Sequence, residues 1–231
     1  MVTKDFLFLH EQIMLLALRD KEGTIATSTM YKYAISGAIL AELILNNRIV
    51  VDESKKRKLI RVLDSTPVGE PLIDECFDKI KNANRNQSLQ TWVSRFSSVK
   101  NLKHRVAKHL CQRGILRVDE SKILLIFNRT IYPEVNPEPE RKLIEQLREA
   151  IFSNTERIDP RTVVLISLCN GTEILKAIFD RKTLKVRKDR INQIINGELT
   201  GKAVKEVRDA MQAAVMVTCI LPAIVSTTVS H

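Results

Sequence analysis

Side chains that could perform acid–base chemistry are few in this chain. His10 and Glu11 are neighbours in an apolar, helix-like stretch at residues 6–19. Adjacent residues on a helix point to different faces, so these two groups are not placed to act on one substrate. The sequence contains no G-x-S-x-G, P-loop, G-x-G-x-x-G or H-E-x-x-H motif. We therefore expect a protein with no catalytic residues, which is not an enzyme.

Possible metal ligands are also poorly spaced. The spacing of His104, His109 and Cys111 fits no common zinc pattern. The four cysteines are widely separated and form no C-x-x-C pair, and the chain starts without a signal peptide, so we expect reduced thiols in a cytosolic setting. We predict no metal site and no cofactor.

The overall charge points to an anionic partner. A formal net charge of +10 at pH 7 favours nucleic acid, an anionic membrane surface or an acidic protein. Aromatic residues make up only 5% of the chain, with a single tryptophan, so stacking platforms for single-stranded nucleic acid are scarce. Composition therefore favours a lipid or protein partner over nucleic acid.

The densest positive run leaves one alternative open. It lies at residues 181–190 and contains Arg181, Lys182, Lys185, Arg187, Lys188 and Arg190. In a nucleic-acid-binding protein this segment would be a helix that contacts phosphates.

Hydrophobic periodicity predicts mostly helices. We expect them at residues 6–19, 33–45, 71–81, 89–96, 101–113, 140–152, 159–168, 173–179 and 188–195, and again after Gly201. A short strand is expected at 48–51, and a β-hairpin with strands at 115–118 and 123–127 around a turn at 119–122. The predicted fold is mainly α: a single compact helical domain over residues 1–231 with one or two short β-hairpins.

The uncharged segment at residues 210–229 is about as long as a membrane span. Gln212, Pro222 and the polar residues 226–228 interrupt it, and its apolar residues are small. A helix that is apolar all round is also typical of a protein core. We favour a buried terminal helix over a tail anchor.

Short segments in order along residues 5–215 resemble the Golgi phosphoprotein 3 family. They are L-R-D-K-E-G at 18–23, G-A-I-L-A-E-L at 37–43, D-S-T-P-V-G at 64–69, Q-T-W-V at 90–93, R-V-A-K at 105–108, R-G-I-L at 113–116 and D-P-R-T at 159–162. The resemblance implies a mostly helical, non-catalytic peripheral membrane protein on cytosolic membrane faces that binds phosphatidylinositol 4-phosphate. In eukaryotic members it further implies a place on the Golgi and a role in trafficking, linking membrane-protein tails to a vesicle coat.

The same resemblance implies where the lipid headgroup binds. Two basic family positions, three apart on the helix before R-G-I-L, correspond to Lys100 and Lys103. The family's pocket tryptophan corresponds to Thr27 or Ser28, and its pocket arginine to Ser36. Hydroxyl groups can bond a phosphate or inositol but carry no charge, so the pocket departs from the family pattern. Such a departure fits a bacterial or divergent member.

The family's hairpin corresponds to residues 119–130 and here carries the apolar residues Ile123, Leu124 and Leu125. The resemblance implies that it inserts into a membrane or mediates self-association into a homo-oligomer, whereas packing on the core is the structural alternative. Together these patterns predict a protein that binds an anionic phospholipid membrane.

Overall fold

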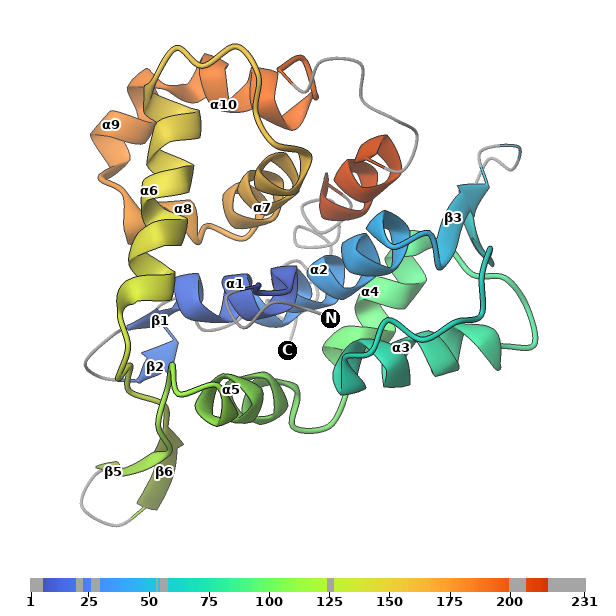
Figure 1. Cartoon of the computed structure of the whole chain (residues 1–231), viewed down its shortest axis with the longest axis horizontal. Coiled ribbons are helices and arrows are strands. Elements are labelled where there is room, and N and C mark those ends of the chain that lie inside the picture. Colours follow the sequence, from blue (N-terminus) through green and yellow to red (C-terminus); the bar gives the residue numbers. More distant parts are fainter. Residues whose placement is uncertain are drawn as a thin grey trace, which may run out of the picture.

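Two apolar helices lie at the centre of the molecule. The computed structural model describes residues 6–19, 23–25, 30–52, 54, 58–123, 127–199 and 207–215. Helices α1 (Leu9–Ala17) and α2 (Tyr31–Leu45) pack against each other, and most of the other helices surround them (Figure 1). The side chains of Ala34, Ala38 and Ala41 on α2 are fully buried. These small residues let neighbouring helices approach closely.

The surrounding helices start at caps that the sequence supplies. Ser88, Asp159 and Asp180 accept hydrogen bonds from backbone N–H groups in the first turns of α4 (Leu89–Ser97), α7 (Pro160–Gly171) and α9 (Arg181–Val186). The remaining helices are α3 (Pro71–Lys81), α5 (Leu102–Gln112), α6 (Glu138–Phe152), α8 (Leu175–Ile178), α10 (Lys188–Ile195) and a helix at 207–215. Every helix expected from the periodicity has a counterpart, and α9 is additional.

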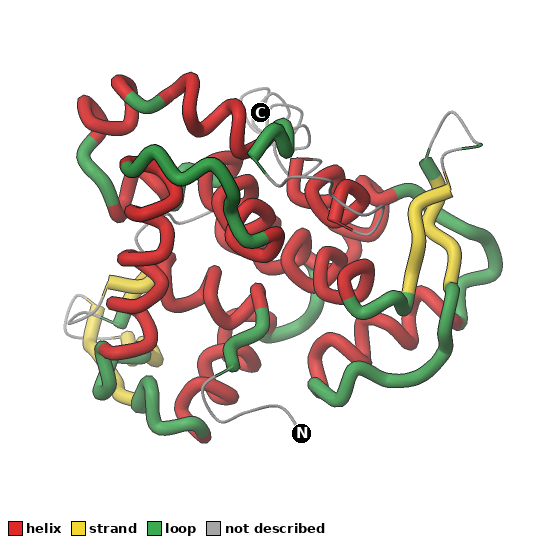
Figure 2. The backbone as a smooth tube through the Cα atoms, turned by 45° about the horizontal axis from the view of Figure 1, so that its top comes forward, coloured by secondary structure: helices red, strands yellow, loops and turns green. Residues whose placement is uncertain are grey.

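Short antiparallel strand pairs complete the described part of the chain. They are β1 (Leu18–Arg19) with β2 (Thr24–Ile25), β3 (Ile49–Asp52) with β4 (Leu59–Val62), and β5 (Asp119–Ile123) with β6 (Phe127–Ile131). None of these pairs joins another to form a larger sheet in the described residues (Figure 2). The prediction of a mainly α fold is confirmed.

The predicted register of the β5–β6 hairpin is wrong. The polar run 119–122, expected as a turn, forms most of β5, and Lys122 pairs with Asn128. The expected strand at 115–118 lies outside the pair, in the connection from α5. The hairpin projects from the helical body (Figure 1), so a strand in it need not present an apolar face to the core. Polar composition therefore does not identify the turn here.

The buried apolar side chains of the described residues form one cluster. Trp92 is 2% exposed, which confirms that it belongs to the core. Ala210, Ala213 and Ala214 are fully buried in the helix at 207–215, as expected for the start of the terminal segment, and the rest of that segment lies outside the described residues. That residues 1–231 form a single domain stays a prediction.

No helix among the described residues combines the length and apolar character needed to cross a membrane.

Candidate functional site

The two lysines of the expected headgroup site lie at the beginning of α5. Lys100 is exposed in the turn after α4, and Asn101 at the N-cap has a left-handed backbone with φ of 56°. Lys103 follows in the first helical turn. The expectation that both lysines belong to one helix is therefore corrected: the left-handed residue between them breaks the helical path, and only Lys103 has a position fixed by α5.

Lys103 lies in a positively charged environment. Its Nζ is 5.7 Å from the ring centroid of Tyr132, within reach of a cation–π contact. Partial burial lowers the pKa of Lys103, and the nearby Arg129 on β6 lowers it further by repulsion. Neither cation forms an ion pair with a described residue. Lys103 and Arg129 therefore carry local positive charge that an anion would offset.

Tyr132 joins α5 to the segment between the first two helices. Its hydroxyl is 2.7 Å from Nδ1 of His104, and its backbone N–H donates to the carbonyl of Gly23, 3.0 Å away. Gly23 has a φ of 58°, and a Cβ placed there would overlap backbone atoms of Tyr132 and Pro133. This close approach brings the segment after α1 next to the lysine site, and only glycine permits it.

The other expected site residues are not positioned beside Lys103 by any contact within the described residues. Ser36 is fully buried, and its hydroxyl donates to the carbonyl of Lys32 one turn earlier at 2.7 Å. Its only proton is therefore used inside α2. Ser28, Leu124 and Leu125 lie outside the described residues. Ile123 is the last paired residue of β5, opposite Phe127.

Two residues of this site were missed from the sequence. Arg129 and Tyr132 stand far from Lys103 in the chain, and they reach α5 only because the β5–β6 hairpin returns beside it. The usable signal was an arginine and an aromatic residue shortly after the predicted hairpin strand at 123–127.

The basic run at 181–190 does not form one helix. α9 ends at Val186 and α10 begins at Lys188, with Arg187 between them. The guanidinium of Arg187 donates to the carbonyl of Phe152 at 2.8 Å. That of Arg190 donates to the carbonyls of Ala150, at 3.2 Å, and Thr155. The two arginines thus bond carbonyls at the end of α6 and just after it, where no helical partner is available.

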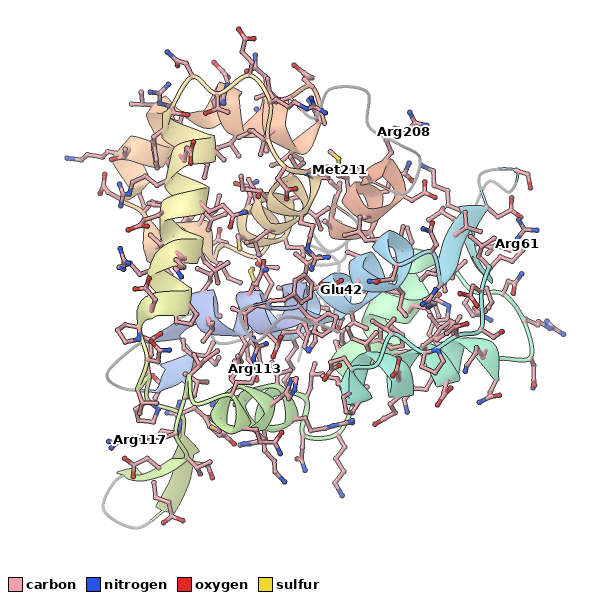
Figure 3. All side chains as sticks on the ribbon, viewed as in Figure 1. Glu42, Arg61, Arg113, Arg117, Arg208 and Met211 are labelled. Atoms are coloured by element: carbon pink, nitrogen blue, oxygen red, sulfur yellow. The ribbon has the colours of Figure 1, made fainter. Side chains whose placement is uncertain are left out.

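Several residues that carry the resemblance form buried ion pairs. Glu42 on α2 is fully buried near the middle of the molecule and accepts from Arg161 on α7 and from the backbone N–H of Leu9 (Figure 3). Glu11 on α1, also fully buried, accepts from Arg113 at 2.9 Å. Figure 3 places Arg113 between α1 and α5. These motif residues hold the central helices together.

His10 and Glu11 do not act as an acid–base pair. Complete burial and, to a smaller extent, the positive charge of His109 lower the pKa of His10 from 6.5 to about 3. Neither ring nitrogen of His10 has a hydrogen-bond partner among the described residues, and a carboxylate oxygen of Glu70 lies 3.7 Å from Nε2. Glu11 is instead engaged with Arg113 and with His109, whose Nδ1 is 3.0 Å from it. His10 is therefore a neutral core residue at neutral pH.

This burial gives a testable pH dependence. Below pH 6.5 His10 binds a proton in the unfolded chain but not in the folded protein. The free energy of unfolding therefore falls as the solution is acidified. The effect is about 1 kcal/mol per pH unit, continuing toward about pH 3. His10→Gln should reduce this slope between about pH 6 and pH 4, as measured by urea unfolding.

The difference between the wild type and this variant isolates His10 from its neighbours. Burial raises the pKa of Glu70, which contributes with the opposite sign in both proteins. Equal slopes for wild type and His10→Gln would show that His10 is accessible to protons in the folded state.

The two fully buried cysteines of the described residues, Cys76 and Cys169, have raised pKa values. Burial raises the pKa of Cys76 to about 12 and raises that of Cys169 as well, so both thiols stay protonated. Within the described ranges no group of histidine, cysteine and acidic side chains is arranged to hold a metal ion. His104 and His109 are engaged with Tyr132 and Glu11 respectively.

Comparison with known proteins agrees with the resemblance that the sequence segments carry. The family model for Golgi phosphoprotein 3 (GPP34) matches residues 9–211. The vacuolar protein sorting-associated protein 74 of Eremothecium gossypii is 28% identical over 205 residues, and the match covers 75% of this chain and 61% of that protein. The chain thus spans about three-fifths of the length of this relative. The protein belongs to the Golgi phosphoprotein 3 family.

Proposed function

We propose that this protein is a non-catalytic peripheral membrane protein that binds an anionic phospholipid through the N-terminal end of α5. The observation that carries the proposal is the pair of cations Lys103 and Arg129, close enough to lower the pKa of Lys103 and without an ion-pair partner among the described residues. Lys100 adds an exposed charge next to them. Membership of the Golgi phosphoprotein 3 family supports this assignment.

A phosphate monoester fits this chemistry best. Its oxygens carry a double negative charge and can accept hydrogen bonds from two or three cationic donors at once, whereas a phosphodiester carries a single charge. Phosphatidylinositol 4-phosphate presents such a group on a membrane surface and is our proposed ligand. Ser36 cannot contribute while its hydroxyl is bonded inside α2, so Arg129 takes its place in the proposed site. Ser28 stays a proposed contact from the segment after β2.

Two further roles follow from this proposal. The β5–β6 hairpin projects from the helical body next to α5 (Figure 1), and we assign to Ile123, Leu124 and Leu125 either membrane insertion or contact with a second copy. The related vacuolar protein sorting-associated protein supports a role in trafficking. We place the protein on a cytosolic membrane face, that of the Golgi if its source is eukaryotic, where it would act as an adaptor for membrane-protein tails.

The test is co-sedimentation with vesicles that contain phosphatidylinositol 4-phosphate, phosphatidylserine or phosphatidylglycerol at matched charge. Lys100→Ala with Lys103→Ala should remove the preference for phosphatidylinositol 4-phosphate and weaken its binding about thirtyfold, since each of the two lysines near an anionic surface contributes about 1 kcal/mol. Arg129→Ala alone should weaken the same preference. Folding should be unaffected, because exposed or half-exposed lysines add little stability.

The matched control removes two lysines from α9. Lys182→Ala with Lys185→Ala changes the net charge equally, and α9 lies at the opposite edge of the molecule from α5 (Figure 1). This control should change vesicle binding less than about twofold. A wild type without headgroup preference, or a Lys100/Lys103 variant that keeps it, would contradict the proposal. Tighter binding to a single-stranded oligonucleotide in the same salt series would favour the nucleic-acid alternative.

A further inference from the structure

A second basic site lies on α8, α9 and α10, away from the lysines of α5. A depression of about 290 Å³ opens between these helices and the end of α7. We call it the basic cup. Its charged lining residues are Lys176, Arg181, Lys185 and Lys188, and no acidic residue in the described part of the chain lines it.

Most of the charge in the basic cup is uncompensated. Lys176 pairs with Glu173, whereas Arg181, Lys185 and Lys188 form no ion pair with any described residue. Asp180, the acidic residue next to Arg181, accepts from the backbone N–H groups of Lys182 and Thr183 at the start of α9. It is therefore occupied as a helix cap.

The floor of the basic cup is apolar. Leu175, Leu184 and Ile191 line it below the cations. Arg181, Leu184 and Lys185 stand at helical spacings of three and four on α9, so they share one face. Lys188, at the start of α10, lines the same depression. Lys182, although it is also on α9, is not among the residues that line the depression.

We propose that the basic cup binds an acidic segment of a partner protein, with an apolar side chain on the floor and carboxylates on the surrounding cations. Charge complementarity selects the acidic residues, and the aliphatic floor requires an apolar group that an isolated phosphate lacks. Such a segment corresponds to an amphipathic acidic helix laid into a groove.

Nucleic acid and a membrane fit the basic cup less well. The only aromatic residue of α8–α10 and their connections is Phe179, which is 6% exposed and packs against Phe152. No ring is thus available for stacking on a base. Figure 1 places α9 and α10 at the opposite edge of the molecule from α5. A membrane on the α5 edge would therefore lie on the other side of the molecule from the helices that line the basic cup.

The experiment measures fluorescence anisotropy of labelled peptides with the full chain and no membrane present. The probe is a peptide of glutamate and leucine at helical spacing, about three turns long. Lys185→Glu with Lys188→Glu should weaken its binding about tenfold or more, because each new glutamate repels the peptide carboxylates that the lysine attracted. Lys182→Glu, on the same helix but outside the lining, should weaken it less than about twofold. Circular dichroism confirms that each variant is folded.

Two comparison ligands complete the test. A peptide with serine in place of each leucine should bind about tenfold more weakly, since one leucine side chain loses its apolar contact with the floor. An oligonucleotide of equal charge should bind more weakly than the leucine peptide. The proposal fails if Lys182→Glu weakens binding of the leucine peptide as much as the double change does, or if the serine peptide binds as tightly as the leucine peptide. It also fails if the oligonucleotide binds more tightly, or if the double change weakens vesicle binding as much as peptide binding.

Discussion

Replacing Glu42 by alanine is expected to lower the free energy of unfolding by about 3–5 kcal/mol. Glu42 is fully buried and accepts from Arg161 and from the backbone N–H of Leu9, the latter at 2.7 Å. The change leaves the guanidinium without its carboxylate and the first turn of α1 without an acceptor, and both donors are costly to leave unpaired. Urea unfolding measures the loss.

Two variants sharpen this prediction. Glu42→Gln keeps an acceptor for Leu9 but loses the charge, so its cost should lie between those of alanine and the wild type. Glu145→Ala removes an exposed carboxylate on α6 that pairs with Arg141 and should change stability by less than about 0.5 kcal/mol. If Glu42→Ala proved as mild as Glu145→Ala, Glu42 would not join α1, α2 and α7 as described.

Gly23→Ala should disrupt both stability and the lysine site. A Cβ on Gly23 overlaps backbone atoms of Tyr132 and Pro133, and the residue has a left-handed φ of 58°. The backbone must therefore separate, which removes the hydrogen bond from Tyr132 to Gly23. We expect a loss of more than about 2 kcal/mol in unfolding free energy. Weaker binding to vesicles with phosphatidylinositol 4-phosphate should accompany it, because Tyr132 lies against Lys103.

Gly114 provides the matched control for this change. It has a φ of 72°, but a Cβ there would meet no atom within 4 Å. Gly114→Ala carries only the left-handed strain, about 1 kcal/mol, and should leave vesicle binding intact. Equal effects of the two alanines would mean that the close approach of Gly23 to Tyr132 contributes nothing to the site.

Residues with strong local chemistry were predictable from the sequence. Asp159 followed by proline predicted the start of α7, and the carboxylate accepts from two backbone N–H groups there. The segments around Glu42, Arg113 and Arg161 were identified by their resemblance to the family in sequence. That resemblance did not indicate which ion pairs these residues form. Their roles needed the fold, because Glu42 and Arg161 are joined only when α2 packs on α7.

The sequence by itself predicted most of the helices and the family, because caps, glycine and proline positions and apolar periodicity act over a few neighbouring residues. Only the tertiary structure decided how the charges are used. Arg187 and Arg190 have the same chemistry as Arg181, yet they bond carbonyls at the end of α6 while Arg181 lines the basic cup. Arg129 likewise reaches Lys103 through the hairpin. Solvation and pairing of a charge depend on segments distant in the chain, and residue type alone does not encode them.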